Sequence, residues 1–170
     1  MDKKDKDIAL FVAFCIEEYG AAKELSGEQV LDLFSQYGVT DYLCNCFEPL
    51  HTQGRQWLIA EIDEFIAINK KNKECLLQPC ILLNQEKLRN NMFQINQNNL
   101  HLLLPGKISW LVEYLHNDYG FSLKESLDHI YHSALYKKLS KADTHYWQLS
   151  PVDLYEELKR ERHNLFKYNY

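Results

Sequence analysis

The chain has no long hydrophobic run, and its opening residues do not resemble a signal peptide. A membrane-spanning helix needs about 20 consecutive apolar residues, and no apolar run in the sequence approaches that length. The first seven residues, Met1 to Asp7, are mostly charged, whereas a signal peptide has an apolar core. We therefore expect a cytoplasmic protein that does not act at a membrane.

The chain also lacks an excess of positive charge and an even set of cysteines. Nineteen Lys and Arg residues face 24 Asp and Glu residues, which gives a net charge of -5 and does not favour nucleic acid as a partner. Five cysteines in a reducing compartment are expected to be free thiols. Cys44 and Cys46 are too close for a zinc finger, and we interpret Cys75 and Cys80 as free thiols too. We expect no metal and no cofactor.

No catalytic motif is present. There is no nucleophile elbow and no phosphate-binding glycine loop, and the adjacent Asp63 and Glu64 cannot share a helical face as an acid–base pair. His51 lies in a polar turn, where it can cap a helix or meet a ligand. His129 and His132 are one helical turn apart, but no third ligand accompanies them, so a solvated helix face is the simpler interpretation. We expect that the protein is not an enzyme.

Helical periodicity is what the chain does contain. Leu58, Ile62, Phe65 and Ile66 follow the spacing of one helix face, and Ser26 with Gln29 forms a predicted capping box at the start of another helix. The predicted helices of the first half are Ile8–Tyr19 with an end near Gly20, a second from Ser26 to Tyr37, a short third capped by Thr40–Asp41, and a fourth ending near Lys70.

The second half repeats this order 96 residues later. Ile108–Leu115 is again an apolar helix, Ser122 with Glu125 forms a second predicted capping box, and Ser150-Pro151 opens a last helix. Gapless superposition at this offset places Ser26 on Ser122. The sequence thus predicts an all-α protein of two related four-helix units in tandem, at residues 1–72 and 107–170, joined by an irregular Asn/Gln-rich connecting segment at 73–106.

The connecting segment allows three interpretations, because asparagine disfavours helix interiors and no clean periodicity is present. It is a linker with docked apolar ends, a short hairpin, or a partner-binding strap. In the third case the contacts come from Arg89, Met92, Phe93 and Ile95. Tyr146 and Trp147 belong to a cluster of aromatic residues in the second half that suits either a core or a protein interface.

The first half, about Asp7 to Ile68, resembles the bacterial family called domain of unknown function 3791. The resemblance is carried by Phe14-Cys15-Ile16-Glu17-Glu18-Tyr19, Leu25-Ser26-Gly27, Leu33-Phe34-Ser35-Gln36-Tyr37-Gly38-Val39, Tyr42, and Leu50-His51-Thr52-Gln53-Gly54 leading to Ile62-Asp63-Glu64-Phe65-Ile66. We call His51, Thr52, Gln53 and Gly54 the motif turn. The second half resembles a diverged copy, with Trp147-Gln148-Leu149-Ser150-Pro151 where the motif turn would stand.

The resemblance implies a partner. Members of this family are typically encoded beside a protein that resembles an ADP-ribosyltransferase (domain of unknown function 3990), an arrangement that suggests a toxin and its antitoxin. We therefore expect a protein-binding antitoxin that covers the toxin's dinucleotide site through the segment Asn84–Asn99 or the cleft between the two units. The alternatives are a DNA-binding regulator of its own operon, and a small enzyme that uses His51 or the pair His129 and His132.

Overall fold

Every element that the structure describes is helical. The computed structural model describes residues 2–73 and 95–167, except for the side chains of residues 71–73 and 162–167. No strand occurs within these ranges, which confirms the predicted all-α class. The elements are α1 (Lys3–Lys23), α2 (Gly27–Tyr37), α3 (Val39–Asn45), α4 (Phe47–Leu50), α5 (Arg55–Lys73), η1 (Leu100–Leu102), α6 (Leu104–Tyr119), α7 (Leu123–Tyr131), α8 (Ala134–Leu139), η2 (Ala142–Thr144), η3 (Tyr146–Gln148) and α9 (Pro151–Lys167).

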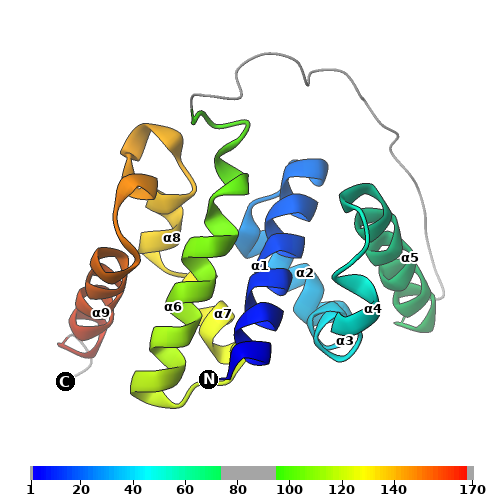
Figure 1. Cartoon of the computed structure of the whole chain (residues 1–170), viewed down its shortest axis with the longest axis horizontal. Helices are drawn as coiled ribbons and strands as arrows, with labels where there is room; N and C mark the ends of the chain where they lie inside the picture. The colour runs from blue at the N-terminus through cyan, green and yellow to red at the C-terminus, as the bar shows by residue number, and fades with distance from the viewer. Residues whose placement is uncertain (1, 74–94, 168–170) are drawn as a thin grey trace.

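Helices α1 and α6 lie side by side at the centre of the molecule (Figure 1). Val12 and Ile16 of α1 and Ile108 and Leu111 of α6 are fully buried. Helices α2 and α5 pack against α1, while α7 and α9 pack against α6. The buried apolar residues of both halves belong to a single core. Among the described helices, none has the length and apolar character that a membrane crossing requires.

The two predicted capping boxes are confirmed. Ser26 Oγ accepts a hydrogen bond from the Gln29 amide at 3.2 Å, and Gln29 Oε1 accepts one from the Ser26 amide at 2.9 Å. Ser122 and Glu125 make the same pair of contacts at 3.3 and 2.8 Å. Because each box satisfies two otherwise unpaired amides, it fixes the first residue of its helix. Ser150 likewise accepts a hydrogen bond from the Asp153 amide at the start of α9.

The end predicted for the first helix was wrong. Helix α1 continues through Gly20 to Lys23, and Glu24 terminates it in the left-handed conformation at φ 57°. The Gly20 carbonyl accepts the amides of both Glu24 and Leu25. A Cβ at Gly20 would lie 2.9 Å from the Leu25 carbonyl oxygen. Glycine therefore gives the following turn room to close on the helix and does not interrupt the helix itself.

The predicted Thr40–Asp41 cap was also wrong. Helix α3 begins at Val39, directly after Gly38, and has no side-chain cap. Thr40 lies inside the helix and is buried, and its hydroxyl has no hydrogen-bond partner in the part of the chain that the structure describes. Asp41 instead pairs with Lys124 at 2.6 Å, which connects α3 to the start of α7. Gly38 ends α2 in the left-handed conformation, at φ 74°, and α3 starts at the next residue. Its start, Val39, lies one residue before the predicted cap at Thr40.

A close approach joins the N-terminus of α2 to the α7–α8 pair. A Cβ on Gly27 would lie 2.2 Å from the Tyr136 hydroxyl oxygen and 2.5 Å from the ring of Tyr131. Both tyrosines are buried, and their rings lie 4.6 Å apart. Only glycine leaves space for the two rings at this point.

Candidate partner-binding groove

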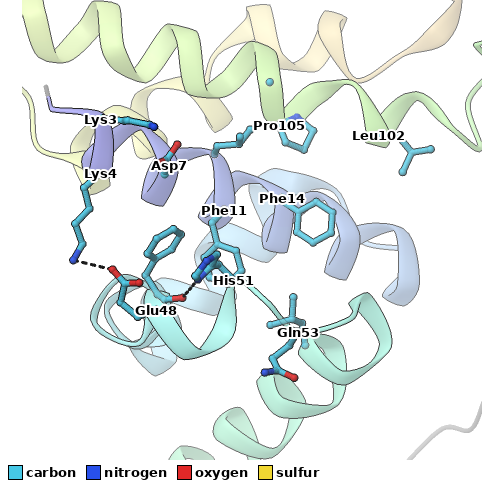
Figure 2. Close-up of a pocket in the computed structure, with 14 residues that line it drawn as sticks. Lys3, Lys4, Asp7, Phe11, Phe14, Glu48, His51, Gln53, Leu102 and Pro105 are labelled. Atoms are coloured by element: carbon cyan, nitrogen blue, oxygen red, sulfur yellow. Dashed lines mark hydrogen bonds and ion pairs between the residues drawn. The ribbon is translucent and has the colours of Figure 1, made fainter.

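An open groove of about 950 Å³ lies between α1, the α4 region and the start of α6 (Figure 2). It brings together three segments that are far apart in the chain, residues 3–14, 47–58 and 102–106. The lining residues are Lys3, Lys4, Asp7, Leu10, Phe11, Phe14, Phe47, Glu48, His51, Gln53, Leu58, Leu102, Pro105 and Gly106. Two of the four residues of the motif turn, His51 and Gln53, are among them.

His51 is held in place at the C-terminal end of α4. Its ring stacks on Phe47 with the centroids 4.5 Å apart, and Nδ1 lies 2.9 Å from the Phe47 carbonyl oxygen. A carbonyl oxygen only accepts, so Nδ1 carries the hydrogen in this contact and Nε2 of the neutral ring is an acceptor. His51 therefore caps the C-terminal end of α4, not the start of α5 as its place before that helix suggested, and it also lines the groove; contact with a ligand stays a prediction.

The rest of the motif turn connects α4 to α5. Thr52 Oγ1 and Gln53 Nε2 both donate to the Pro49 carbonyl, at 3.3 and 3.2 Å. The Gly54 carbonyl accepts the Leu58 amide at 3.0 Å, so Gly54 occupies the N-cap position of α5. These contacts fix the direction in which α5 leaves the groove and leave His51, Thr52 and Gln53 exposed.

The groove has an apolar floor and an apolar rim. Phe11 and Leu58 are buried, whereas Leu10 and Leu102, which also line the groove, are 42% and 59% exposed. Exposed large apolar side chains beside a concave apolar surface are typical of a binding site for another molecule. Lys4 and Glu48 form an ion pair of 3.0 Å at one end (Figure 2).

An ion pair with a buried carboxylate lies next to the groove, where Glu18 follows the groove residue Phe14 by one turn of α1. The Glu18 carboxylate is paired with Arg55 Nε from the start of α5, and His101 Nε2 from η1 lies 3.8 Å away. Burial lowers the pKa of His101, against the opposing effect of Glu18. The cluster therefore ties three groove-lining elements, α1, α5 and η1, to a common point.

The predicted partner-binding residues do not form this groove. Arg89, Met92 and Phe93 lie outside the described residues. Ile95, Tyr146 and Trp147 are half-buried and pack against the core. The Trp147 indole donates to the Ala142 carbonyl at 3.0 Å, and the Tyr146 ring lies below the Lys138 ammonium at 5.1 Å. In the described part of the chain, these aromatic residues mainly stabilise the η2–η3 region.

The candidate pair His129 and His132 lies outside the groove, where each ring contacts other side chains. His129 stacks on Phe121 with the centroids 4.9 Å apart. His132 contacts Asp32 at 3.2 Å and Asp128 at 3.2 Å; burial opposes its charge, but the Asp128 carbonyl and both carboxylates raise its pKa. Among the side chains that the structure describes, no group of three His, Cys, Asp or Glu is placed to hold a metal.

Comparison with known protein families finds a match within the first half of the chain. Residues 10–69 match the family model described as "Protein of unknown function (DUF3791)". This range contains the motif turn, Glu18 and Arg55, but not the α6 side of the groove. No curated protein and no solved structure matches the chain.

Proposed function

We propose that this protein acts by binding another protein and that the groove around His51 and Gln53 is its binding surface. The observation that carries the proposal is the combination of the motif turn with the exposed side chains of Leu10 and Leu102 on one concave apolar surface. A partner segment that buries an apolar side chain there would remove both leucines from water, at about 25 cal/mol per Å² of apolar surface.

We propose an ADP-ribosyltransferase-like toxin (domain of unknown function 3990) as the partner and antitoxin as the role. The family match of residues 10–69 supports this assignment, because the resemblance implies such a neighbour. The net charge of -5 favours fast association with a basic partner. The mechanism is steric: the bound protein covers the dinucleotide site of the toxin, and no chemical step by this chain is required.

We also propose that the chain is a tandem repeat whose second copy has diverged. Helices α2, α3 and α5 begin at Gly27, Val39 and Arg55, and α7, α8 and α9 begin 96, 95 and 96 residues later. Ser150 N-caps α9 where Gly54 N-caps α5. In place of the exposed motif turn, the second half has the half-buried Trp147, so the repeat supports one groove of this kind and not two.

The test is binding of the adjacent ADP-ribosyltransferase-like protein by the full chain and by two groove variants. Leu10→Asp and Leu102→Asp place a charge on the rim, and both positions are exposed, so folding is preserved. Each variant is expected to bind at least about 10-fold more weakly, which corresponds to about 1.4 kcal/mol, and to lose the ability to relieve growth arrest.

Val152→Asp is the matched control, because Val152 is 55% exposed on α9 and does not line the groove. It is expected to bind like the unaltered chain. Circular dichroism verifies that all three variants are folded. Wild-type affinity in both rim variants, or no binding by the unaltered chain, would contradict the proposal.

A further inference from the structure

Glu17 is a carboxyl group in the interior, at the junction of α1 and α2 with α7 and α8. It is 6% exposed. The Tyr136 hydroxyl, 119 positions away in the sequence, donates to Glu17 Oε1 at 2.9 Å. The Tyr131 hydroxyl lies beside the same carboxyl group but outside strict hydrogen-bonding geometry. Gly27 lies next to both tyrosines and has no room for a side chain. The carboxyl group is therefore enclosed by two helices from each half.

No cation pairs with Glu17 among the described residues. The titratable groups that act on it are Tyr136, Tyr131 and Glu18, and the charge of Glu18 is already paired with Arg55. Cys15 lies close enough to act electrostatically on Tyr131, and burial of its thiol raises the pKa so far that the thiol is neutral. The Lys137–Glu28 pair, at 3.4 Å, joins α8 to α2 but involves side chains that are 58% and 32% exposed.

An unpaired carboxylate in such surroundings is costly, whereas the neutral acid is not. Burial raises the pKa of Glu17 to about 7 and Glu18 adds to the rise, although the Tyr136 hydrogen bond and the nearby Tyr131 hydroxyl act in the opposite direction. The neutral acid also has a hydrogen to donate, and among the described residues the Tyr131 hydroxyl beside it has no hydrogen-bond partner. Protonation of Glu17 therefore removes the buried charge and offers the Tyr131 hydroxyl a hydrogen-bond partner.

We propose that Glu17 is a protonation-controlled latch that holds α7 and α8 against α1 and α2. The junction is tight while the carboxyl group is neutral, and it opens more often when ionisation drives the carboxylate toward water. An acid whose pKa is raised in the closed state stabilises that state below its ordinary pKa and loses this contribution as the pH rises through the raised value. The closed junction thus weakens between about pH 4.5 and about pH 7 and changes little above.

The test is hydrogen exchange of the backbone amides of α7 and α8 in the full chain, corrected for intrinsic chemical exchange. The protection factor is expected to fall on the order of 30-fold between about pH 5.5 and about pH 8. Glu17→Gln keeps a neutral side chain at all pH values, so its protection is expected to be constant and equal to that of the unaltered chain at low pH. Glu24→Gln, at an exposed position, is the matched control and is expected to retain the fall.

A second measurement does not depend on any variant. The carboxyl carbon of Glu17, followed by carbon NMR in the unaltered chain, is expected to titrate near pH 7, well above the ordinary value for glutamate. Titration of Glu17 at its ordinary value would overturn the proposal. Constant protection in the unaltered chain, or an undiminished pH dependence in a folded Glu17→Gln variant, would overturn it as well.

Discussion

Two adjacent glutamates of α1, Glu17 and Glu18, are both buried, but only Glu18 has a cation beside it among the described residues. Glu17 points toward the α7–α8 side, where Tyr136 donates to it and no cation is near among the described groups. Glu18 points toward α5, where Arg55 neutralises it. Neighbouring residues on a helix face directions about 100° apart, so the same residue type meets two different environments. One carboxyl group is therefore stabilised as the neutral acid and the other as an ion.

Removal of the Arg55 charge tests how much the ion pair with Glu18 stabilises the fold. Arg55→Met is expected to lower the free energy of unfolding by about 2 kcal/mol at neutral pH, because it leaves the Glu18 carboxylate buried without a cation. The value is below that of a fully enclosed pair because the Arg55 side chain is 39% exposed. Urea denaturation measures it, and adding Glu18→Gln is expected to restore most of the loss.

The surface pair Lys4–Glu48 provides the control, since both side chains are more than 60% exposed. Lys4→Met is expected to change the free energy of unfolding by less than about 0.5 kcal/mol. Equal losses for Arg55→Met and Lys4→Met would show that burial of Glu18 has no energetic consequence.

At the scale of the helices, the sequence predicts what is decided locally. The boxes at Ser26 and Ser122 need only residues three positions apart, and both form. Thr40 has the right side chain for a cap, but the left-handed Gly38 starts α3 earlier and buries the hydroxyl. That outcome depends on how α2 and α3 pack, which a local pattern does not contain.

Stability measurements distinguish the capping residues Ser26 and Ser122 from Thr40, which does not cap α3. Ser26→Ala and Ser122→Ala are each expected to lower the free energy of unfolding by about 1 kcal/mol, because each leaves helix amides without an acceptor. Thr40→Val keeps the side-chain shape and removes a buried hydroxyl that has no partner within residues 2–73 and 95–161, so it is expected to raise the free energy of unfolding by up to about 1 kcal/mol. A loss of stability in Thr40→Val would mean that the hydroxyl has a partner after all.

At the scale of the whole molecule, the groove depends on both halves. Its His51 side could be singled out from the sequence, because a polar turn with a lone glycine precedes a clear helix. The opposite holds for Leu102 and Pro105, which could not be identified as groove residues from the sequence. Nothing in the local pattern around them indicates that they lie beside α1. The contact of α1 with α6 brings the two sides together, and its buried residues belong to the same core as those of the outer helices.

A shared core of this kind predicts one cooperative unfolding transition. Ile16→Ala in α1 and Leu111→Ala in α6 each remove a fully buried side chain, at a cost of about 3 kcal/mol. Both are expected to lower the midpoint of the same single transition, followed by circular dichroism and by calorimetry, because neither helix keeps its packing without the other. Val152→Ala, at an exposed position, is expected to leave the midpoint unchanged. Two separate transitions, with each variant shifting only the one that contains its own helix, would show that the halves unfold independently and that the α1–α6 contact is a weak interface between domains.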